Sequence, residues 1–166
     1  DLIRDLFADV PEARERGFGP SSFSFNSGDG RCDHCQGLGY ERVEMQFLSD
    51  VLLVCPTCDG RRYNPDVLEV RYRDRNIADV LGLTVHEALM FFGDQPEIRR
   101  ALQPLIDVGL EYLRLGQPLS TLSAGESQRI KMIRHLGSSL TDVTYVFDEP
   151  TIGLHPHDIQ RMNDLL

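Results

Sequence analysis

The chain has 166 residues, which is enough for one domain with a full hydrophobic core or for two small units. Lysine and arginine number 17 against 26 aspartates and glutamates, and the resulting net charge of −9 excludes a protein that coats nucleic acid over its whole surface. No run approaches the roughly 18 apolar residues of a membrane span and no secretory segment is visible, so the composition predicts a soluble, cytoplasmic protein without a membrane partner.

Residues 1 to 16 are expected to form a helix that breaks near Pro11. An apolar-periodic stretch already runs through the first residues and another runs through the last ones, so we expect the chain to be a piece of a longer protein. Residues 17 to 30 are rich in glycine, serine and phenylalanine. Phe18, Phe23 and Phe25 are expected to pack on neighbouring side chains, and base stacking is the alternative.

Two Cys-x-x-Cys pairs come next, and 19 residues separate them. This spacing predicts a metal site with four thiolate ligands: Cys32, Cys35, Cys55 and Cys58. Four thiolates fill a tetrahedral shell, so we expect one structural Zn²⁺ per chain, with an iron–sulfur cluster or unligated thiols as alternatives. His34, between the first two cysteines, is interpreted as a surface residue and not as a ligand.

Alternating apolar residues predict a strand at Val43, Met45 and Phe47, and a second at Leu68, Val70 and Tyr72. Both strands would belong to a small β-unit held together by the metal. The segment from 61 to 75 also carries five arginines against three acids. This Arg61–Arg75 face either contacts a DNA backbone or is a solvated strand face, and the sequence leaves both readings open.

The pattern becomes helical from Thr84, where Thr84 and Glu87 form a predicted capping box. A further helix is expected from Pro96, and Pro104 should bend it or end it early. A second capping box, Ser123 with Glu126, predicts another helix start. Gly125 lets backbone N–H groups approach a ligand there, so the first turn of this helix is a candidate phosphate site, although an ordinary capped surface helix is the simpler reading.

Residues 143 to 147 form a short run with high β-strand propensity, and Asp148 and Glu149 follow it directly. Carboxylates at the end of such a strand lie where α/β sheets bind their ligands. We expect Asp148 to hold Mg²⁺ and Glu149 to act as the base that orients or deprotonates the attacking water. An acidic turn after a strand is the alternative reading.

The segments LSAGESQRIK and YVFDEPTIGLH resemble the signature and the Walker B to D-loop segments of ABC-type ATPases. With GRCDHCQGLGYERVEMQFLSDV and DVGLEYLRLGQPLSTLSAGESQRIK, the likeness narrows to the UvrA family of excinuclease A subunits, the damage-recognising ATPases of bacterial nucleotide excision repair. It covers essentially the whole chain. The lead-in RDLFADVPEARERGFGPSSFSFN indicates the C-terminal nucleotide-binding half of such a protein.

The resemblance implies an α/β fold, of which this chain would be an α+β fragment. The fragment would be part of an ABC-type P-loop ATPase domain, with a four-cysteine zinc β-unit and a helical signature subdomain. Four parts are expected: a lead-in (1–30), the zinc unit (31–82), the signature subdomain (83–137), and part of the nucleotide-binding core (138–166).

In this family the ATP sites form between modules. Ser123, Gly125 and Glu126 would therefore contact the γ-phosphate of ATP held by another module, while Asp148 and Glu149 would serve an upstream Walker A loop. Damaged double-stranded DNA, a second copy of the protein and UvrB are the implied partners. Lys131 is the one lysine in the chain and has no P-loop glycines around it, so the isolated chain is expected to hydrolyse no ATP.

Two positions depart from common ABC patterns. Ala124 replaces the first glycine of the signature pair, which predicts slower turnover, and His155 stands at the D-loop aspartate position, as is usual in UvrA proteins. Three other classes compete: a UvrA-like paralogue that confers resistance to DNA-binding drugs, a DnaJ-type zinc co-chaperone, and an ABC transporter ATPase. The co-chaperone would leave the signature helix unexplained, and a transporter would leave the zinc unit unexplained.

Overall fold

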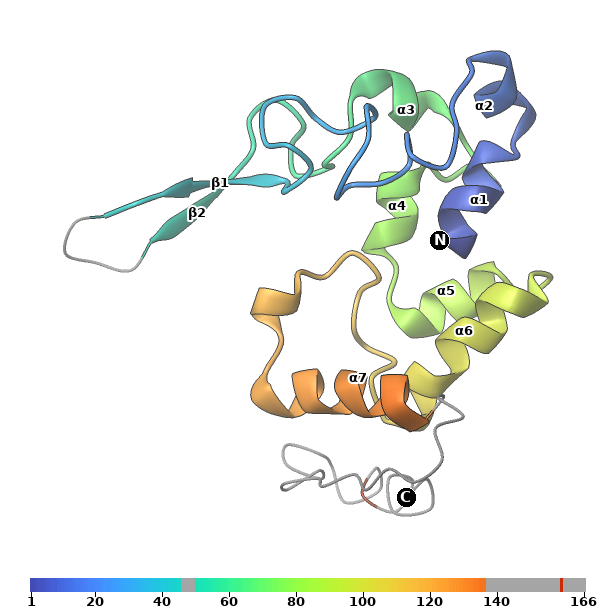
Figure 1. The fold of residues 1–166 in the computed structure, drawn as a ribbon, viewed down its shortest axis with the longest axis vertical. Coiled ribbons are helices and arrows are strands. Elements are labelled where there is room, and N and C mark those ends of the chain that lie inside the picture. Colours follow the sequence, from blue (N-terminus) through green and yellow to red (C-terminus); the bar gives the residue numbers. More distant parts are fainter. Residues whose placement is uncertain (46–49, 137–158, 160–166) are drawn as a thin grey trace. The chain divides into compact units, whose positions relative to one another are not determined.

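The structure is a computed structural model, and it describes residues 1–45, 50–136 and 159 (Figure 1). The chain divides into two compact units, Asp1–Val80 and Leu81–Leu166. Helices and a small antiparallel sheet make it an α+β fragment, as the sequence predicted. Within the described residues, no helix is both long and apolar enough to cross a membrane.

The first unit begins with α1 (Leu2–Ala8) and α2 (Pro11–Glu15), and Pro11 starts α2 at its first position. The predicted break is therefore confirmed. Phe7 and Phe23 are buried with ring centroids 5.5 Å apart, and Phe18 meets Phe23 edge to face at 6.4 Å. Phe25 lies beneath the Arg62 guanidinium at 5.0 Å, so all three predicted phenylalanines pack on neighbours.

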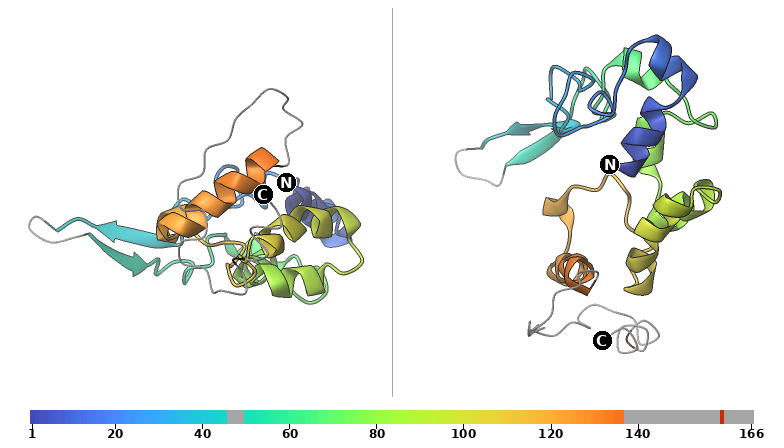
Figure 2. Two further views of the ribbon diagram at one scale, coloured as in Figure 1. Left: turned by 90° about the horizontal axis from the view of Figure 1, so that it is seen from below. Right: turned by 45° about the vertical axis from the view of Figure 1, so that its right-hand side comes forward.

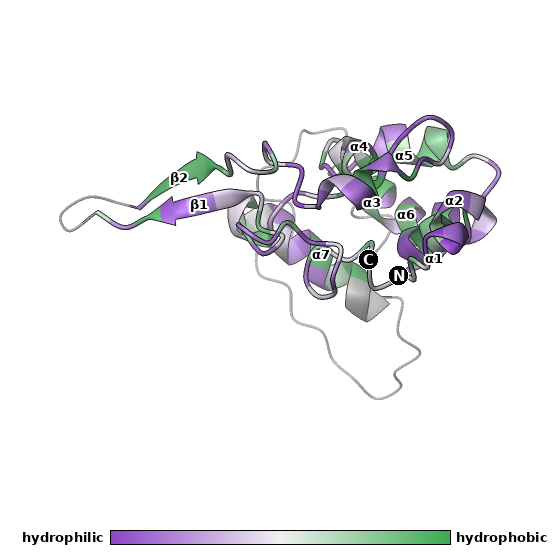
Figure 3. Cartoon of the chain, turned by 90° about the horizontal axis from the view of Figure 1, so that it is seen from above, coloured by the Kyte–Doolittle hydropathy of each residue, from purple (hydrophilic) through white to green (hydrophobic). Residues whose placement is uncertain are grey.

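The segment between the two Cys-x-x-Cys pairs contains a two-stranded hairpin, β1 (Tyr40–Val43) and β2 (Val51–Val54). It extends away from α1, α2 and α3 of the same unit (Figures 1 and 2), and β2 is apolar along its length (Figure 3). The predicted half-buried strand through Met45 is wrong in its end and in its burial. β1 ends at Val43, before Met45, and the side chains of Val43 and Met45 are both exposed. Phe47 lies outside the described residues. The alternation of apolar and polar residues indicates a strand, but one face of a strand is buried only where another layer of structure packs on it, and this hairpin has no such layer among the described residues.

The predicted strand at Leu68, Val70 and Tyr72 is also wrong, because α3 (Pro65–Glu69) occupies its first half. Asn64 caps this helix by accepting a hydrogen bond from Val67 N at 3.0 Å, and Pro65 supplies the first helical position. The buried side chains are Val67 and Val70, three residues apart, as on one face of a helical turn. The helix start at Asn64 and Pro65 therefore determines the structure here, and the alternating apolar residues that follow do not.

The helix α4 (Ile77–Gly82) follows, and the second unit continues with α5 (Val85–Phe91) and α6 (Pro96–Asp107). The Thr84–Glu87 capping box at the start of α5 is confirmed, with both hydrogen bonds formed at 3.1 and 2.9 Å. Pro96 starts α6 as predicted. However, Pro104 does not end α6 early, since the helix continues for three residues to Asp107.

After a short 3-10 helix, η1 (Leu119–Thr121), the helix α7 (Ala124–Leu136) begins at the predicted position. Its Met132 is buried among Val108, Leu110 and Leu113, and Ile130 and Ile133 pack against this cluster. One hydrophobic cluster of this unit thus forms between α7 and the segment that follows α6. Gly137, a residue type that commonly ends helices, lies outside the described residues.

Candidate metal centre and signature helix

The four cysteines of the two pairs come together in one buried cluster. All four sulfurs lie within 4.8 Å of one another, with Cys32 Sγ 3.9 Å from Cys55 Sγ and Cys35 Sγ 3.6 Å from Cys58 Sγ. A tetrahedral zinc ion with Zn–S bonds of about 2.3 Å requires sulfurs roughly 3.8 Å apart along each edge. The cluster therefore fits one four-coordinate zinc ion, as the spacing predicted.

Backbone hydrogen bonds hold the two Cys-x-x-Cys turns against each other. Cys32 N donates to Arg62 O at 2.8 Å, and Cys55 N donates to Gly39 O at 3.1 Å, so each turn is tied to the residues after the other. The sulfurs also accept backbone N–H groups, from Gly39 to Cys35 at 3.2 Å and from Arg62 to Cys58 at 3.4 Å. Such donors stabilise thiolates, which are the metal-binding form.

The pKa of Cys55 reflects two opposing effects. Burial raises the pKa of this thiol, but hydrogen bonds from the backbone N–H groups of Cys58 and Thr57 lower it, to about 7. A thiol with this pKa is about half ionised at neutral pH, and a bound cation would favour its ionised form.

His34 lies next to the cluster, and its ring pairs with Glu41 outside it. His34 Nε2 lies 2.5 Å from Glu41 Oε1, and both side chains are partly exposed. These two groups and Cys55 come close enough together to hold an ion, but Cys55 already belongs to the buried set of four. The geometry thus supports the interpretation of His34 as a surface residue.

The start of α7 carries the predicted capping box. Glu126 N donates to Ser123 Oγ at 3.2 Å, and Ser123 N donates to Glu126 Oε2 at 2.7 Å. Ser123 and Ala124 are exposed, and Gly125 is buried. The start of this 13-residue helix is therefore exposed at Ser123 and Ala124, where the sequence predicted a phosphate site, but it is covered at Gly125.

Two further residues at this helix start have no sequence signal. Tyr112 donates a hydrogen bond from its hydroxyl to Glu126 Oε1 at 2.6 Å. Arg129, one turn after Glu126, is buried, with 3% of its surface exposed. The pKa of Glu126 is lowered mainly by the hydrogen bond from Tyr112, and the charge of Arg129 adds a smaller effect in the same direction. Tyr112 is 14 residues before Glu126, a separation at which no local periodicity predicts a contact.

The other half of the predicted nucleotide site is not covered by the structure. Asp148 and Glu149 lie outside the described residues, as does His155. Their assigned roles remain predictions from the sequence.

No protein-family model matches the chain. It is 54% identical over 165 residues to the UvrABC system protein A of Methanothermobacter thermautotrophicus, and this alignment covers 99% of this chain and 17% of that protein. It is also 54% identical over 167 residues to the UvrABC system protein A of Aquifex aeolicus, which covers the whole chain and 18% of that protein. UvrA2 from Deinococcus radiodurans matches in structure with a TM-score of 0.91 at 54% identity, over 99% of this chain and 20% of that one.

The chain thus spans less than a fifth of the length of the curated relatives it matches. More than half of its residues are identical to theirs along essentially its whole length, and its backbone follows that of a solved UvrA2 closely. The four-cysteine cluster and the capped signature helix lie within this matched length. The chain belongs to the UvrA family.

Proposed function

We propose that this chain is a segment of an ABC-type ATPase that recognises DNA damage in nucleotide excision repair. The whole-length identity to proteins called UvrABC system protein A supports the repair role. The observation that carries the ATPase role is the capped start of α7 at the Ser-Ala-Gly-Glu sequence, where Ser123 and Ala124 are exposed.

In the complete protein, the start of α7 would contact the γ-phosphate of ATP held by another module. Ser123 Oγ accepts the Glu126 N–H, and its hydroxyl hydrogen, which helps to lower the pKa of Glu126 after the larger effects of Tyr112 and the Ser123 N–H, would turn to a phosphate oxygen. Gly125 allows close approach of the backbone, and the helix dipole favours the negative charge. Asp148 would hold Mg²⁺, and Glu149 would act as the general base.

The zinc unit would be structural and would hold one ion per chain. Four buried thiolates leave no open coordination position for substrate or water, which supports a structural role and not a hydrolytic one. We place this unit at residues 31–82, between the lead-in (1–30) and the signature subdomain (83–137), with the nucleotide-binding core at 138–166. It would couple nucleotide state to DNA binding.

Damaged double-stranded DNA, a second copy of the same protein and a UvrB-type subunit are the proposed partners, in the cytoplasm. The name UvrABC system protein A, carried by the relatives, supports a multi-subunit repair system.

The test uses the complete protein with Glu149→Gln. Loss of the general base should slow ATP turnover by a factor of about 10² to 10⁴ while ATP affinity stays unchanged. Glu97→Gln, an equal charge change on the exposed side of α6, is the matched control and should keep wild-type turnover. Unchanged turnover in Glu149→Gln would remove the general base from the proposal, and ATP hydrolysis by the isolated chain would contradict the division of the site between modules.

A further inference from the structure

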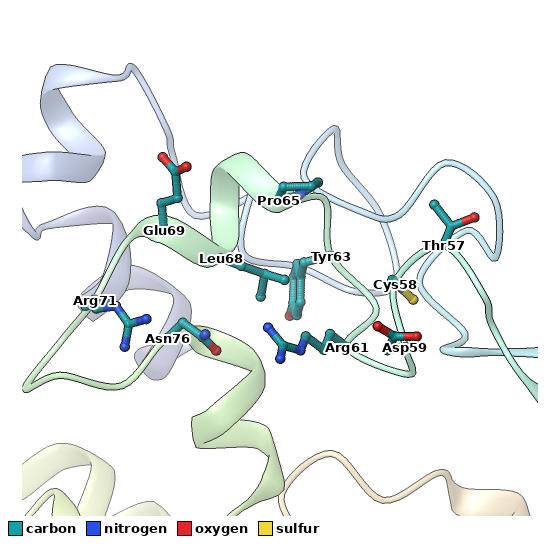
Figure 4. Close-up of a pocket in the computed structure, with 10 residues that line it drawn as sticks. All are labelled: Thr57, Cys58, Asp59, Arg61, Tyr63, Pro65, Leu68, Glu69, Arg71 and Asn76. Carbon is teal, nitrogen blue, oxygen red and sulfur yellow. The ribbon is translucent and has the colours of Figure 1, made fainter.

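An open cavity of about 500 Å³ lies beside the metal centre, between the second Cys-x-x-Cys turn and α3. Its polar wall includes Arg61, Arg71 and Asn76, and its apolar wall includes Tyr63, Pro65 and Leu68 (Figure 4). The roles assigned to the metal centre and to α7 do not use this cavity. It belongs entirely to the first unit.

The two arginines of the cavity lie beside hydrogen-bonded turns of the backbone. Arg61 follows the second metal-binding turn, and its N–H donates to Cys58 O at 2.9 Å. Arg71 precedes a tight turn in which Tyr72 and Arg75 exchange two backbone hydrogen bonds, at 2.9 and 3.1 Å. Arg71 Nη1 also donates to Asp74 O at 2.9 Å. Both guanidinium groups extend toward Asn76 in the close-up (Figure 4).

The charges in the cavity do not cancel. Two acidic residues, Asp59 and Glu69, also line it. Glu69 points away from the arginines (Figure 4) and forms an ion pair with Arg16 at 2.6 Å, which raises the pKa of Arg16. Among the residues that the structure describes, the Arg61 side chain has no ion pair or hydrogen bond. The cavity therefore keeps a net positive charge once Glu69 is paired.

Asn76 adds a buried polar donor. It is 4% exposed, and its Oδ1 accepts the Asp79 N–H at 2.9 Å at the start of α4, which leaves Nδ2 as the donor of this side chain. Tyr63 forms a wall and is not a donor into the cavity, since its buried hydroxyl donates to Phe23 O at 2.9 Å.

We infer that this cavity binds a phosphate group between Arg61 and Arg71, with the Asn76 amide as a third donor. Two guanidinium forks and an amide offer more donors than the two oxygens of a carboxylate accept in one plane, whereas the tetrahedral oxygens of phosphate can accept from several directions. The cavity is larger than a single phosphate ion, so the phosphate belongs to a larger molecule. The phosphate comes from a nucleic-acid strand or from a free phosphate compound. Only the choice between these two sources rests on the proposed function; phosphate binding by the cavity does not.

The test compares the complete wild-type protein with Arg61→Gln, Arg71→Gln and the double variant. Arg99→Gln removes the same charge from exposed α6 in the second unit and is the matched control. In the first arm, binding of a DNA duplex is followed by fluorescence anisotropy over a salt series. Each cavity variant should weaken binding roughly tenfold and lower the salt slope by about one, while the control changes neither.

In the second arm, inorganic pyrophosphate is titrated calorimetrically into wild type and the double variant. The difference between them isolates this cavity from the nucleotide sites, which are the same in both proteins. A loss in the DNA arm assigns the site to a strand phosphodiester, and a loss in the pyrophosphate arm alone assigns it to a free phosphate compound.

If the cavity variants match Arg99→Gln in both arms, the inference is overturned. Unchanged zinc content shows that the variants are folded. If Arg71→Gln disrupts the turn at residues 72–75, Arg61→Gln alone tests the inference, because the Arg61 side chain makes no hydrogen bond or ion pair within the described residues. Wild-type protein that fails to bind DNA would contradict the proposed function, and the pyrophosphate arm would still test the cavity.

Discussion

Tyr112 and Glu126 join two segments at the start of α7. The Tyr112 hydroxyl donates to Glu126 Oε1 at 2.6 Å, while Glu126 Oε2 accepts the Ser123 N–H at 2.7 Å. The peptides on both sides of Tyr112 are held by α5, since Val85 N donates to Leu113 O at 2.8 Å and His86 N donates to Glu111 O at 3.0 Å. The carboxylate that caps the signature helix is therefore fixed by a tyrosine anchored at the start of another helix.

We predict that Tyr112→Phe raises the pKa of Glu126. The hydrogen bond from Tyr112, followed by that from the Ser123 N–H, holds this pKa below its ordinary value. Because the folded pKa is lowered, these bonds stabilise the fold above the ordinary pKa, and the contribution is lost as pH falls through the lowered value. Carbon-13 NMR titration of the Glu126 carboxyl group measures the change. Tyr40→Phe, in the hairpin, is the control, and an unchanged Glu126 titration in Tyr112→Phe would contradict the prediction.

Thr84→Ala should lower the free energy of unfolding by about 1 kcal/mol, the usual cost of losing an N-cap side chain. Thr84 Oγ1 accepts the Glu87 N–H at 3.1 Å, and this donor loses its partner in the variant. Denaturant unfolding followed by circular dichroism measures the loss. Ser120→Ala, at an exposed position in η1, should leave stability unchanged, and an equal effect of the two substitutions would show that the cap contributes nothing.

We predict one tightly held zinc ion per chain, and that Cys58→Ser weakens its binding while His34→Ala does not. Cys58 belongs to the buried set of four sulfurs, whereas the His34 ring pairs with Glu41. Metal analysis after purification without chelator gives the stoichiometry. Loss of zinc in His34→Ala would make His34 a ligand, and a wild-type protein with two disulfides and no metal would overturn the assignment.

Gly37→Ala is expected to disrupt the first metal-binding turn. Gly37 has φ of +85°, and a Cβ at this position would lie 2.0 Å from Phe25 O, so both the backbone conformation and the space exclude a side chain. We expect a loss of stability of more than about 1 kcal/mol together with weaker zinc retention. Gly19→Ala has nothing within 4 Å of the added atom and should retain both properties. Thermal unfolding and zinc content measure the effects, and normal zinc retention in Gly37→Ala would refute the prediction.

Local sequence determined the elements whose causes lie within a few residues of each other. The capping boxes at Thr84 and Ser123 and the helix starts at Pro11 and Pro96 depend on contacts between neighbours in the chain, so the sequence predicted them correctly. The cysteine spacing predicted the four-cysteine cluster for a related reason, because tetrahedral thiolate coordination restricts how four cysteines can be arranged.

Tertiary structure alone decided which patterned surfaces are covered and which distant side chains meet. Alternation at 43–47 predicted a half-buried strand, yet the hairpin is exposed, because periodicity reports side-chain direction and not the presence of a covering layer. Tyr112 reaches Glu126, and Arg61 and Arg71 line one cavity, because packing brings together backbone segments whose separations match no local repeat. The sequence by itself therefore determined the family and the local elements, whereas these contacts required the folded chain.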